Sequence, residues 1–225
     1  IKDGALKAIT VNGSEEFETD VTVLAVGHSA RDTFERLLER SVPIEKKAFA
    51  VGLRIQHPQR DINAAQYGAA EIEALGAADY KVTHQCANGR GVYSFCMCPG
   101  GYVVDASSEP GRLAVNGMSY HARDGVNANS ALIVTVTPQD FPEDSPLAGI
   151  AYQRRLEEAA YRCGGGKIPV QLYRDFKKKR ATTAFGDVAP AFEGRYAMAN
   201  LRDFFPDTLS ESLIEGVEAF NGRIA

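Results

Sequence analysis

The sequence has no tryptophan, few cysteines and no long hydrophobic run. Its most apolar stretches, Val21–Val26 and Ala131–Val136, are far shorter than the roughly 18–20 residues that cross a bilayer, so no membrane association is expected. The first residues also lack the charged-then-apolar layout of a signal peptide. Four cysteines in 225 residues are too few for a disulfide framework, which predicts reduced thiols in a cytoplasmic protein.

An excess of charge of either sign is also missing. The 25 Lys and Arg residues against 29 Asp and Glu residues give a formal net charge of −4, which argues against a nucleic-acid or anionic-membrane partner. A hydrophobic share of 44% with 24% charged residues is typical of a globular protein and excludes a disordered tail, a collagen-like fibre and a coiled coil. The length fits one large domain or two small ones.

The first forty residues predict a hairpin, a strand, a glycine turn and a helix. Asn12-Gly13 suits a tight turn because both residues accept positive φ cheaply. The continuous apolar stretch that follows is of the kind that a strand buried on both faces requires. In chain order, the expected elements are strands over Ala5–Val11, Glu16–Thr19 and Val21–Val26, a break at Gly27–Ser29, and a helix over Ala30–Arg40.

The middle of the chain predicts closely spaced strands, which favour an antiparallel sheet or a small barrel. The expected strands are Phe49–Ile55, Tyr80–Cys86, Val92–Cys98, Tyr102–Asp105, Leu113–Met118 and Leu132–Val136. Helices are expected over Leu147–Arg162 and from Thr208 onward, with a weakly patterned segment between them. The predicted fold is therefore mixed α+β: a short α/β fragment, then an antiparallel sheet or small barrel domain with flanking helices.

The end of the apolar strand is the first place where the sequence points to chemistry. Ligands bind beyond the carboxyl ends of parallel strands, and Gly27 would let the backbone approach a cofactor because it has no Cβ. The free N–H groups of the following helix would face the same ligand. The alternative interpretation is an ordinary strand-to-helix turn in which Ser29 caps the helix.

Several segments carry a resemblance to a known family, and two of them are specific: Gly27–Asp32 (GHSARD) and Cys96–Gly101 (CMCPGG). The matching segments are Leu24–Glu35, Ala48–Gln59, Gly76–Thr83, Val92–Val104, Val115–Tyr120 and Asn127–Ala131. On these segments the chain resembles the FAD-dependent dehydrogenases often labelled NAD-utilising dehydrogenases, within the flavoproteins that have two dinucleotide-binding folds.

The resemblance implies a flavin-dependent oxidoreductase that uses FAD, with NAD(P) as a candidate second cofactor and a small molecule as substrate. It implies that FAD lies near two turns, whose residues are Ala25, Val26, Gly27, His28 and Ser29, and Cys98, Gly100 and Gly101. His28 would donate to FAD or cap the helix. The sequence identifies no catalytic acid or base, because its histidines and carboxylates form no arrangement typical of one.

Full-length members of that family carry a G-x-G-x-x-G fingerprint upstream and a second glycine-rich FAD segment near the C-terminus, and this sequence has neither. We therefore expect an internal portion of a larger flavoprotein, with the rest of that parent chain as its partner. Residues 1–42 are expected to belong to the FAD-binding domain, 43–205 to an inserted β-rich substrate domain, and 206–225 to a helix returning toward the FAD domain. The isolated portion is expected to bind FAD weakly and to be inactive.

Three interpretations compete for Cys96 and Cys98: packed thiols, a redox pair, or a metal site with His84 and Cys86. A two-residue turn at Asn88-Gly89 would pair Thr83 with Ser94. In that register His84 and Cys86 lie on one face of the sheet, and Cys96 and Cys98 lie on the other. Because zinc needs converging ligands, no metal site is expected. Same-face neighbours lie ~6.6 Å apart on a flat strand, which disfavours a disulfide.

Two other classes of function are considered for this sequence. A non-catalytic module that binds a ligand or partner is the main alternative to the oxidoreductase, and a flavoprotein that modifies RNA is disfavoured by the net charge of −4. The basic run Arg174–Arg180 could meet the 2′-phosphate of NADP, although isolated charge runs more often form a solvated surface.

Overall fold

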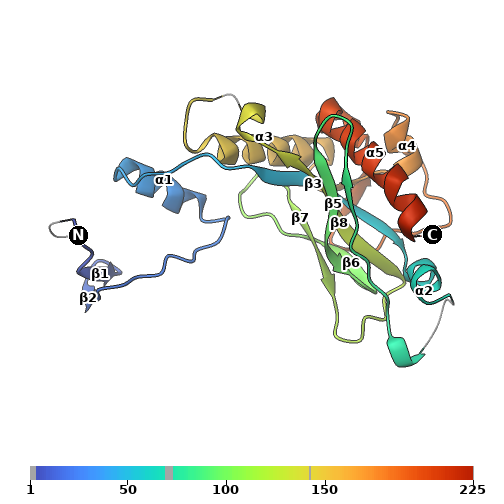
Figure 1. Ribbon diagram of the computed structural model, residues 1–225, viewed down its shortest axis with the longest axis horizontal. Helices are drawn as coiled ribbons and strands as arrows, with labels where there is room; N and C mark the ends of the chain where they lie inside the picture. Colours follow the sequence, from blue (N-terminus) through green and yellow to red (C-terminus); the bar gives the residue numbers. More distant parts are fainter. Residues whose placement is uncertain (1–3, 69–72, 142, 225) are drawn as a thin grey trace. The chain divides into compact units, whose positions relative to one another are not determined.

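The computed structural model describes residues 4–68, 73–141 and 143–224 (Figure 1). The chain divides into two compact units, Ile1–Val42 and Pro43–Ala225, here called the N-terminal and C-terminal units. Among the described residues, no helix combines the length and apolar character that crossing a bilayer requires.

The N-terminal unit contains the predicted hairpin and helix. Strand β1 (Ala8–Val11) pairs antiparallel with β2 (Glu15–Glu18), and Asn12 and Gly13 in the turn adopt φ values of 51° and 74°. Helix α1 (Arg31–Glu39) follows within one residue of its predicted bounds. These two predictions are confirmed.

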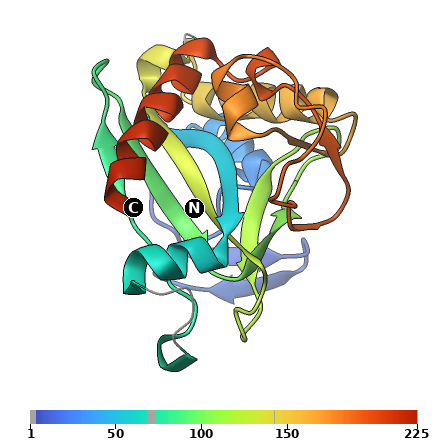
Figure 2. The same ribbon diagram turned by 90° about the vertical axis from the view of Figure 1, so that its right-hand side faces the viewer.

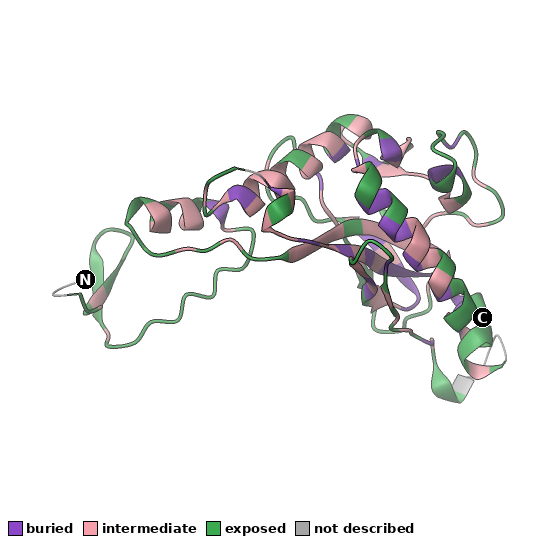
Figure 3. Cartoon of the chain, turned by 45° about the horizontal axis from the view of Figure 1, so that its top comes forward, coloured by how far each residue is buried: buried purple, intermediate pink, exposed green. Residues whose placement is uncertain are grey.

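The segment between the hairpin and α1 differs from the prediction. Residues 21–26 form no strand, and Val21 and Val23 are 78% and 83% exposed (Figure 3). A buried strand needs neighbours for its backbone and its side chains, and none of the strands that the structure describes pairs with this segment. The predicted cap is also wrong, because Ala30 and not Ser29 is the N-cap residue of α1, without a side-chain cap bond.

The C-terminal unit is built on a four-stranded antiparallel sheet, here called the main sheet, in the order β3-β8-β5-β4. The strands span β3 (Phe49–Pro58), β8 (Asn127–Val136), β5 (Gly91–Cys98) and β4 (Thr83–Gln85). This confirms the predicted antiparallel sheet. In the part of the chain that the structure describes, β3 and β4 are edge strands, so the sheet is open and the barrel alternative does not apply.

Two smaller sheets accompany the main sheet. Strand β6 (Gly101–Asp105) pairs antiparallel with β7 (Val115–Ser119) and parallel with β10 (Phe192–Glu193). Strand β9 (Ile168–Val170) pairs parallel with β11 (Tyr196–Met198). Strands β9, β10 and β11 have only two or three residues each, which is too short for a recognisable strand pattern in the sequence.

The described helices of the C-terminal unit are α2 (Gln59–Tyr67), α3 (Ala148–Cys163), α4 (Tyr173–Lys177) and α5 (Asp207–Ile224), with short 3-10 turns at Glu73–Leu75, Pro138–Asp140 and Leu201–Asp203. Helices α3 and α5 lie on one side of the main sheet and the β6–β7 hairpin on the other (Figure 1 and Figure 2). The predicted helices at 147–162 and from 208 onward are confirmed, and so is the mixed α+β fold.

The core lies between α5 and the helix-covered face of the main sheet. Leu209 and Leu213 of α5 are 1% exposed and belong to one cluster with Val92 and Val134, which are fully buried. The opposite face of the sheet carries polar side chains and faces the β6–β7 hairpin. The main sheet therefore has an apolar face under α5 and a more polar face toward the β6–β7 hairpin.

The β4–β5 hairpin has a register one residue away from the prediction. Thr83 pairs with Tyr93 and not with Ser94, because the turn holds three residues, Ala87–Gly89, closed by Gly89 at φ 81°. The pairing of β5 with β8 then shifts again at a bulge between Phe95 and Cys98. A one-residue shift moves every following side chain to the other face of the sheet. The turn causes one such shift and the bulge a second, so Cys98 lies on the face predicted for it, opposite His84 and Cys86.

Candidate functional site

The residues predicted to lie near a cofactor fall in different units of the chain. Ala25–Ser29 lie in the N-terminal unit and are exposed, with Gly27 at φ 74° and open space where a Cβ would stand. Cys98, Gly100 and Gly101 lie in the C-terminal unit, at the turn from β5 to β6. The contacts of this second group define the candidate site.

The bulge in β5 directs Cys98 toward the polar face of the main sheet. Cys96 adopts φ 44°, which a residue with a side chain rarely takes, and the ladder resumes with Cys98 opposite Asn129 of β8. The Ser130 hydroxyl donates to the Phe95 carbonyl at 3.3 Å and fixes the start of the bulge. Bulges of this kind re-aim a side chain, and here the side chain is a thiol.

The glycines after Cys98 allow close packing of the protein's own backbone. A Cβ on Gly100 would lie 1.9 Å from the Arg123 carbonyl oxygen, and one on Gly101 would lie 2.4 Å from the Met118 carbonyl oxygen. The Gly100 N–H donates to Gln59 Oε1 at 2.7 Å. Both glycines are buried by these contacts, and their contact with a cofactor stays a prediction.

Arg54 lies on the edge strand β3, and its side chain reaches across the polar face to contact three other strands. Its Nε donates to Asn129 Oδ1 at 2.5 Å on β8 and its Nη1 to Asn116 Oδ1 at 3.4 Å on β7. Its Nη2 donates to the Cys96 carbonyl at 2.5 Å and lies 3.3 Å from Cys98 Sγ. One guanidinium therefore joins the bulge, the two asparagines and the Cys98 thiol in a cluster that we call the Arg54 cluster.

The charge of Arg54 is not balanced by a carboxylate among the described residues, because its hydrogen-bond partners are two amides, a carbonyl and a thiol. Burial lowers the pKa of the guanidinium from its usual value, and the neighbouring Cys98 side chain opposes that shift. A desolvated cation without an anionic partner is costly and attracts one. The Arg54 cluster is therefore suited to stabilise negative charge on a bound group.

Two further features show that the cluster is closely built. A Cβ on Gly117 of β7 would lie 2.0 Å from Arg54 Nη2 and 2.2 Å from Asn129 Oδ1, so a larger residue there would displace these two side chains. Asn129 is fully buried, and its Nδ2 has no hydrogen-bond partner among the described residues. A buried amide donor without a partner marks a position where a ligand atom would gain a hydrogen bond.

Sequence reasoning missed Arg54, Asn116 and Asn129. A usable signal was present in β8, where Asn127 and Asn129 alternate with the small residues Ala128 and Ser130 and so place two amides on one face of a buried strand. Arg54 gave a weaker signal, a single charge in the apolar strand β3. Neither pattern identifies its partners, because these come from strands distant in sequence.

The basic run at 174–180 is largely neutralised. Lys177 pairs with Glu218 at 3.0 Å, Lys179 with Asp207 at 2.6 Å, and Arg180 with Asp175 at 2.7 Å. Cations that already hold carboxylate partners attract a phosphate weakly. This arrangement favours the solvated surface over contact with the 2′-phosphate of NADP.

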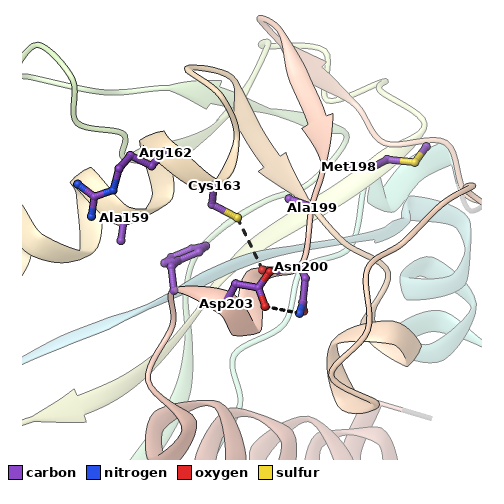
Figure 4. Close-up of a pocket in the computed structure, with 8 residues that line it drawn as sticks. Ala159, Arg162, Cys163, Met198, Ala199, Asn200 and Asp203 are labelled. Atoms are coloured by element: carbon purple, nitrogen blue, oxygen red, sulfur yellow. Dashed lines mark hydrogen bonds between the residues drawn. The ribbon is translucent and has the colours of Figure 1, made fainter.

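A pocket of about 570 Å³ lies between α3, β11 and the 3-10 turn after it (Figure 4). Cys163 lines it and lies 3.6 Å from the Asn200 carbonyl oxygen, and the Asn200 amide donates to Asp203 at 2.6 Å. Burial, and secondarily Asp203, raises the pKa of the Cys163 thiol, which keeps it protonated and unreactive. The pocket shares no lining residue with the Arg54 cluster, so we do not assign it the chemistry of that cluster.

The family described as "FAD-dependent protein, C-terminal domain-like" matches residues 48–225 of this chain. A protein of Clostridium beijerinckii named only as an uncharacterized protein is 52% identical over 227 residues, which cover 99% of this chain and 42% of that relative. The chain thus spans less than half of the relative's length. The matched range contains the whole Arg54 cluster, and the FAD-dependent part of the resemblance is confirmed. By this match over most of its length, the chain belongs to the FAD-dependent protein, C-terminal domain-like family.

Proposed function

We propose that this chain is an internal portion of an FAD-dependent, NAD(P)-utilising oxidoreductase with two dinucleotide-binding folds, and that its C-terminal unit supplies the substrate side of the flavin site. The observation that carries the proposal is the Arg54 cluster, an unbalanced guanidinium beside a thiol, in a family of FAD-dependent proteins. Its partners would be a small-molecule substrate and the rest of the parent chain.

The surroundings of the cluster fit one edge of a flavin and its substrate. Phe95 and Arg54 both pair with Ala131 of β8 and so share one face of the main sheet; Phe95 is 56% exposed there and offers apolar surface for a ring. Cys96, the next residue, is also exposed. The described residues offer no glycine-rich phosphate cradle, so the greater part of FAD would be held by the rest of the parent chain.

Each residue of the cluster would have a defined task. FAD, when bound, supplies the hydride-transfer chemistry. Arg54 would stabilise negative charge on a group bound in front of it, since it has no carboxylate of its own. Asn129 would donate its free Nδ2–H to that group, and Gly117 would keep space for the guanidinium.

The N-terminal unit supports the same proposal. The apolar run 21–26 is exposed at Val21, Val23, Leu24 and Val26, and it leads into the positive-φ turn at Gly27. An extended apolar segment without strand neighbours is suited to pair with a sheet contributed by another part of a protein. We propose that this sheet is the FAD-binding domain of the parent chain and that Ala25–Ser29 then lie beside FAD.

The proposal is tested on the full-length parent protein. We expect it to purify with FAD and to be reduced by NADH or NADPH under anaerobic conditions, as followed by flavin absorbance. Arg54→Gln should retain FAD but lower the rate of flavin reduction roughly 100-fold, the cost of losing one electrostatic donor. The matched control is Arg60→Gln, because the Arg60 side chain is 78% exposed and pairs with its sequence neighbour Asp61.

Four results would contradict the proposal or one of its parts. A parent protein without FAD would remove it. FAD that neither nicotinamide nucleotide reduces would favour a non-catalytic binding module. Equal rates in Arg54→Gln and Arg60→Gln would remove the role of the Arg54 cluster. For the 225-residue chain alone we expect weak or no FAD binding, so micromolar affinity in a fluorescence titration would contradict its status as a portion.

A further inference from the structure

A second cluster of ligand-type side chains lies on the other face of the main sheet, between β4 and α5. His84 and Cys86 are two residues apart on an extended segment and therefore point to the same side, toward α5. Cys86 is 4% exposed and belongs to the core cluster under that helix. On α5, Ser212 and Glu215 are three residues apart and share one face.

The distances bring three donor atoms together. His84 Nε2 lies 3.1 Å from Glu215 Oε1, and the same carboxylate oxygen accepts the Ala87 N–H at 2.9 Å. Cys86 Sγ lies 3.5 Å from the Ser212 carbonyl oxygen. The ligand atoms of His84, Cys86 and Glu215 all lie within 4.8 Å of one another.

Close packing of α5 on the sheet holds these groups together. Gly216, next to Glu215, lies so near the sheet that a Cβ would stand 2.5 Å from Val92 Cγ1. Val92 is the register partner of His84. A glycine at this point of the helix therefore sets the separation at which the Glu215 carboxylate reaches the His84 ring.

The donor set is a nitrogen, a sulfur and an oxygen, which matches the ligands of zinc in proteins. A tetrahedral zinc ion with bonds of about 2.0–2.3 Å separates its ligand atoms by roughly 3.3–3.8 Å. The present separations, 3.1 Å between His84 and Glu215 and at most 4.8 Å overall, need only small side-chain movements. Calcium and magnesium require oxygen ligands and do not suit this set.

We propose that His84 Nε2, Cys86 Sγ and a Glu215 carboxylate oxygen bind one zinc ion that ties α5 to β4. On binding, the Cys86 thiol loses its proton to solvent and a sulfur–zinc bond forms. The proton on His84 Nε2 also leaves, so that the neutral ring carries its one proton on Nδ1, and the His84–Glu215 hydrogen bond is replaced by a nitrogen–zinc and an oxygen–zinc bond. The fourth position is filled by water. Zinc enters from the solvent side, because the His84 and Glu215 side chains are 23% and 41% exposed.

The prediction of no metal site came from a set of four ligands that includes Cys96 and Cys98. Those two cysteines lie outside the present set, and Cys98 is on the opposite face of the sheet. The third ligand, Glu215, follows Cys86 by more than a hundred residues, so no local spacing could indicate it. The proposed zinc site is separate from the Arg54 cluster and does not depend on the proposed oxidoreductase function.

The test is calorimetric titration of zinc into the metal-stripped, tag-free 225-residue chain. We expect one equivalent to bind, and we expect Cys86→Ser and His84→Ala each to weaken binding at least roughly tenfold, the smallest loss seen when even an outer-shell partner is removed. The matched controls are Cys163→Ser, a partly buried thiol elsewhere, and His121→Ala, an exposed histidine. Both should bind zinc as the original chain does.

A second measurement covers the case in which a core variant fails to fold. Glu215→Gln alters only the exposed end of the site, and circular dichroism checks its fold. With Co²⁺ as probe, a sulfur-to-cobalt absorption band should appear in the original chain and in Cys163→Ser, and Glu215→Gln should need at least roughly tenfold more metal to develop it. Less than one equivalent of zinc, unchanged binding in Glu215→Gln, or loss of binding in Cys163→Ser would overturn the proposal.

Discussion

The two most apolar runs of the sequence have opposite environments in the structure. Ala131–Val136 forms part of β8, where Leu132 is 7% exposed and Val134 is fully buried. Val21–Val26 has a similar composition, yet it forms no strand and Val23 is 83% exposed. Hydrophobicity alone therefore does not determine whether a segment becomes a buried strand.

The difference lies in what surrounds each run. Strand β8 pairs with β3 on one side and β5 on the other, and α5 covers the face that carries Val134. Residues 21–26 have no strand partner among the described residues. Backbone groups leave water only where hydrogen-bond partners are present, so an apolar segment without a sheet stays extended and solvated.

The largest expected effect comes from placing the same charge in both runs. In the 225-residue chain, Val134→Asp puts a carboxylate without a partner into the core, and we expect a loss of more than ~4 kcal/mol in the free energy of unfolding. Val23→Asp changes an exposed position, and we expect a change within about 0.5 kcal/mol. Urea unfolding followed by circular dichroism measures both. Equal destabilisation by the two variants would contradict the comparison.

In the full-length parent, the same Val23→Asp substitution should have a large effect. If residues 21–26 pair with a sheet of the FAD-binding domain there, a charge at Val23 is buried and costs several kcal/mol. We expect a lower melting temperature and reduced FAD content by absorbance. The control is Lys7→Asp, on an exposed position of the N-terminal unit. Unchanged FAD content in Val23→Asp would show that the run stays exposed in the parent too.

Local patterns in the sequence predicted most elements of the fold. The turn chemistry of Asn12-Gly13 gave the hairpin, and alternation or helical spacing gave β3, β5, α3 and α5. The patterns gave wrong predictions where the structure of a segment depends on the strand that pairs with it. Residues 21–26 have no strand partner among the described residues, and the β4–β5 register depends on whether the turn closes with two or three residues.

The candidate site was predictable only in part, for a related reason. The Cys98–Gly101 turn was identified from its motif, whereas Arg54 and Asn129 reach Cys98 from strands that are neighbours only in the folded sheet. The prediction had the β4–β5 register wrong by one residue and did not include the bulge in β5. These two errors cancel for Cys98, because the bulge moves it back to its predicted face. A correct face assignment therefore did not mean a correct register.

A smaller effect is expected from loosening the packing of α5 on the main sheet, which buries Val134 of the run Ala131–Val136. Gly216→Ala in α5 would place a Cβ 2.5 Å from Val92 Cγ1, and we expect a loss of about 1–3 kcal/mol because the helix must move off the sheet. Gly222 on the same helix has open space around its Cα, so Gly222→Ala should stabilise by about 0.4–1 kcal/mol. Thermal unfolding of the two variants compares them directly. A neutral Gly216→Ala would mean that α5 covers β5 loosely.

The smallest expected effect concerns the ion pair at the end of the buried run. Arg90 donates to both carboxylate oxygens of Asp140 at 2.6 and 3.0 Å and to the Thr135 carbonyl of β8 at 2.8 Å. Bonds from Arg90 and Thr137 lower the pKa of Asp140 from its usual value. A lowered folded-state pKa stabilises the fold above the unfolded pKa of about 3.9, and this contribution is lost as the pH falls through the folded pKa.

Asp140→Asn should therefore reduce the free energy of unfolding by about 1–2 kcal/mol at pH 7, because both side chains of the pair are less than one-quarter exposed and Arg90 loses its partner. The difference from the original chain should shrink as the pH falls below about 4 and the carboxyl becomes protonated. Asp61→Asn, in an exposed pair with Arg60, should change the same quantity by less than about 0.5 kcal/mol at either pH. Urea unfolding at pH 7 and pH 3 separates the two cases. A deficit in Asp140→Asn that is as large at pH 3 as at pH 7 would mean that packing, and not charge, fixes the end of β8.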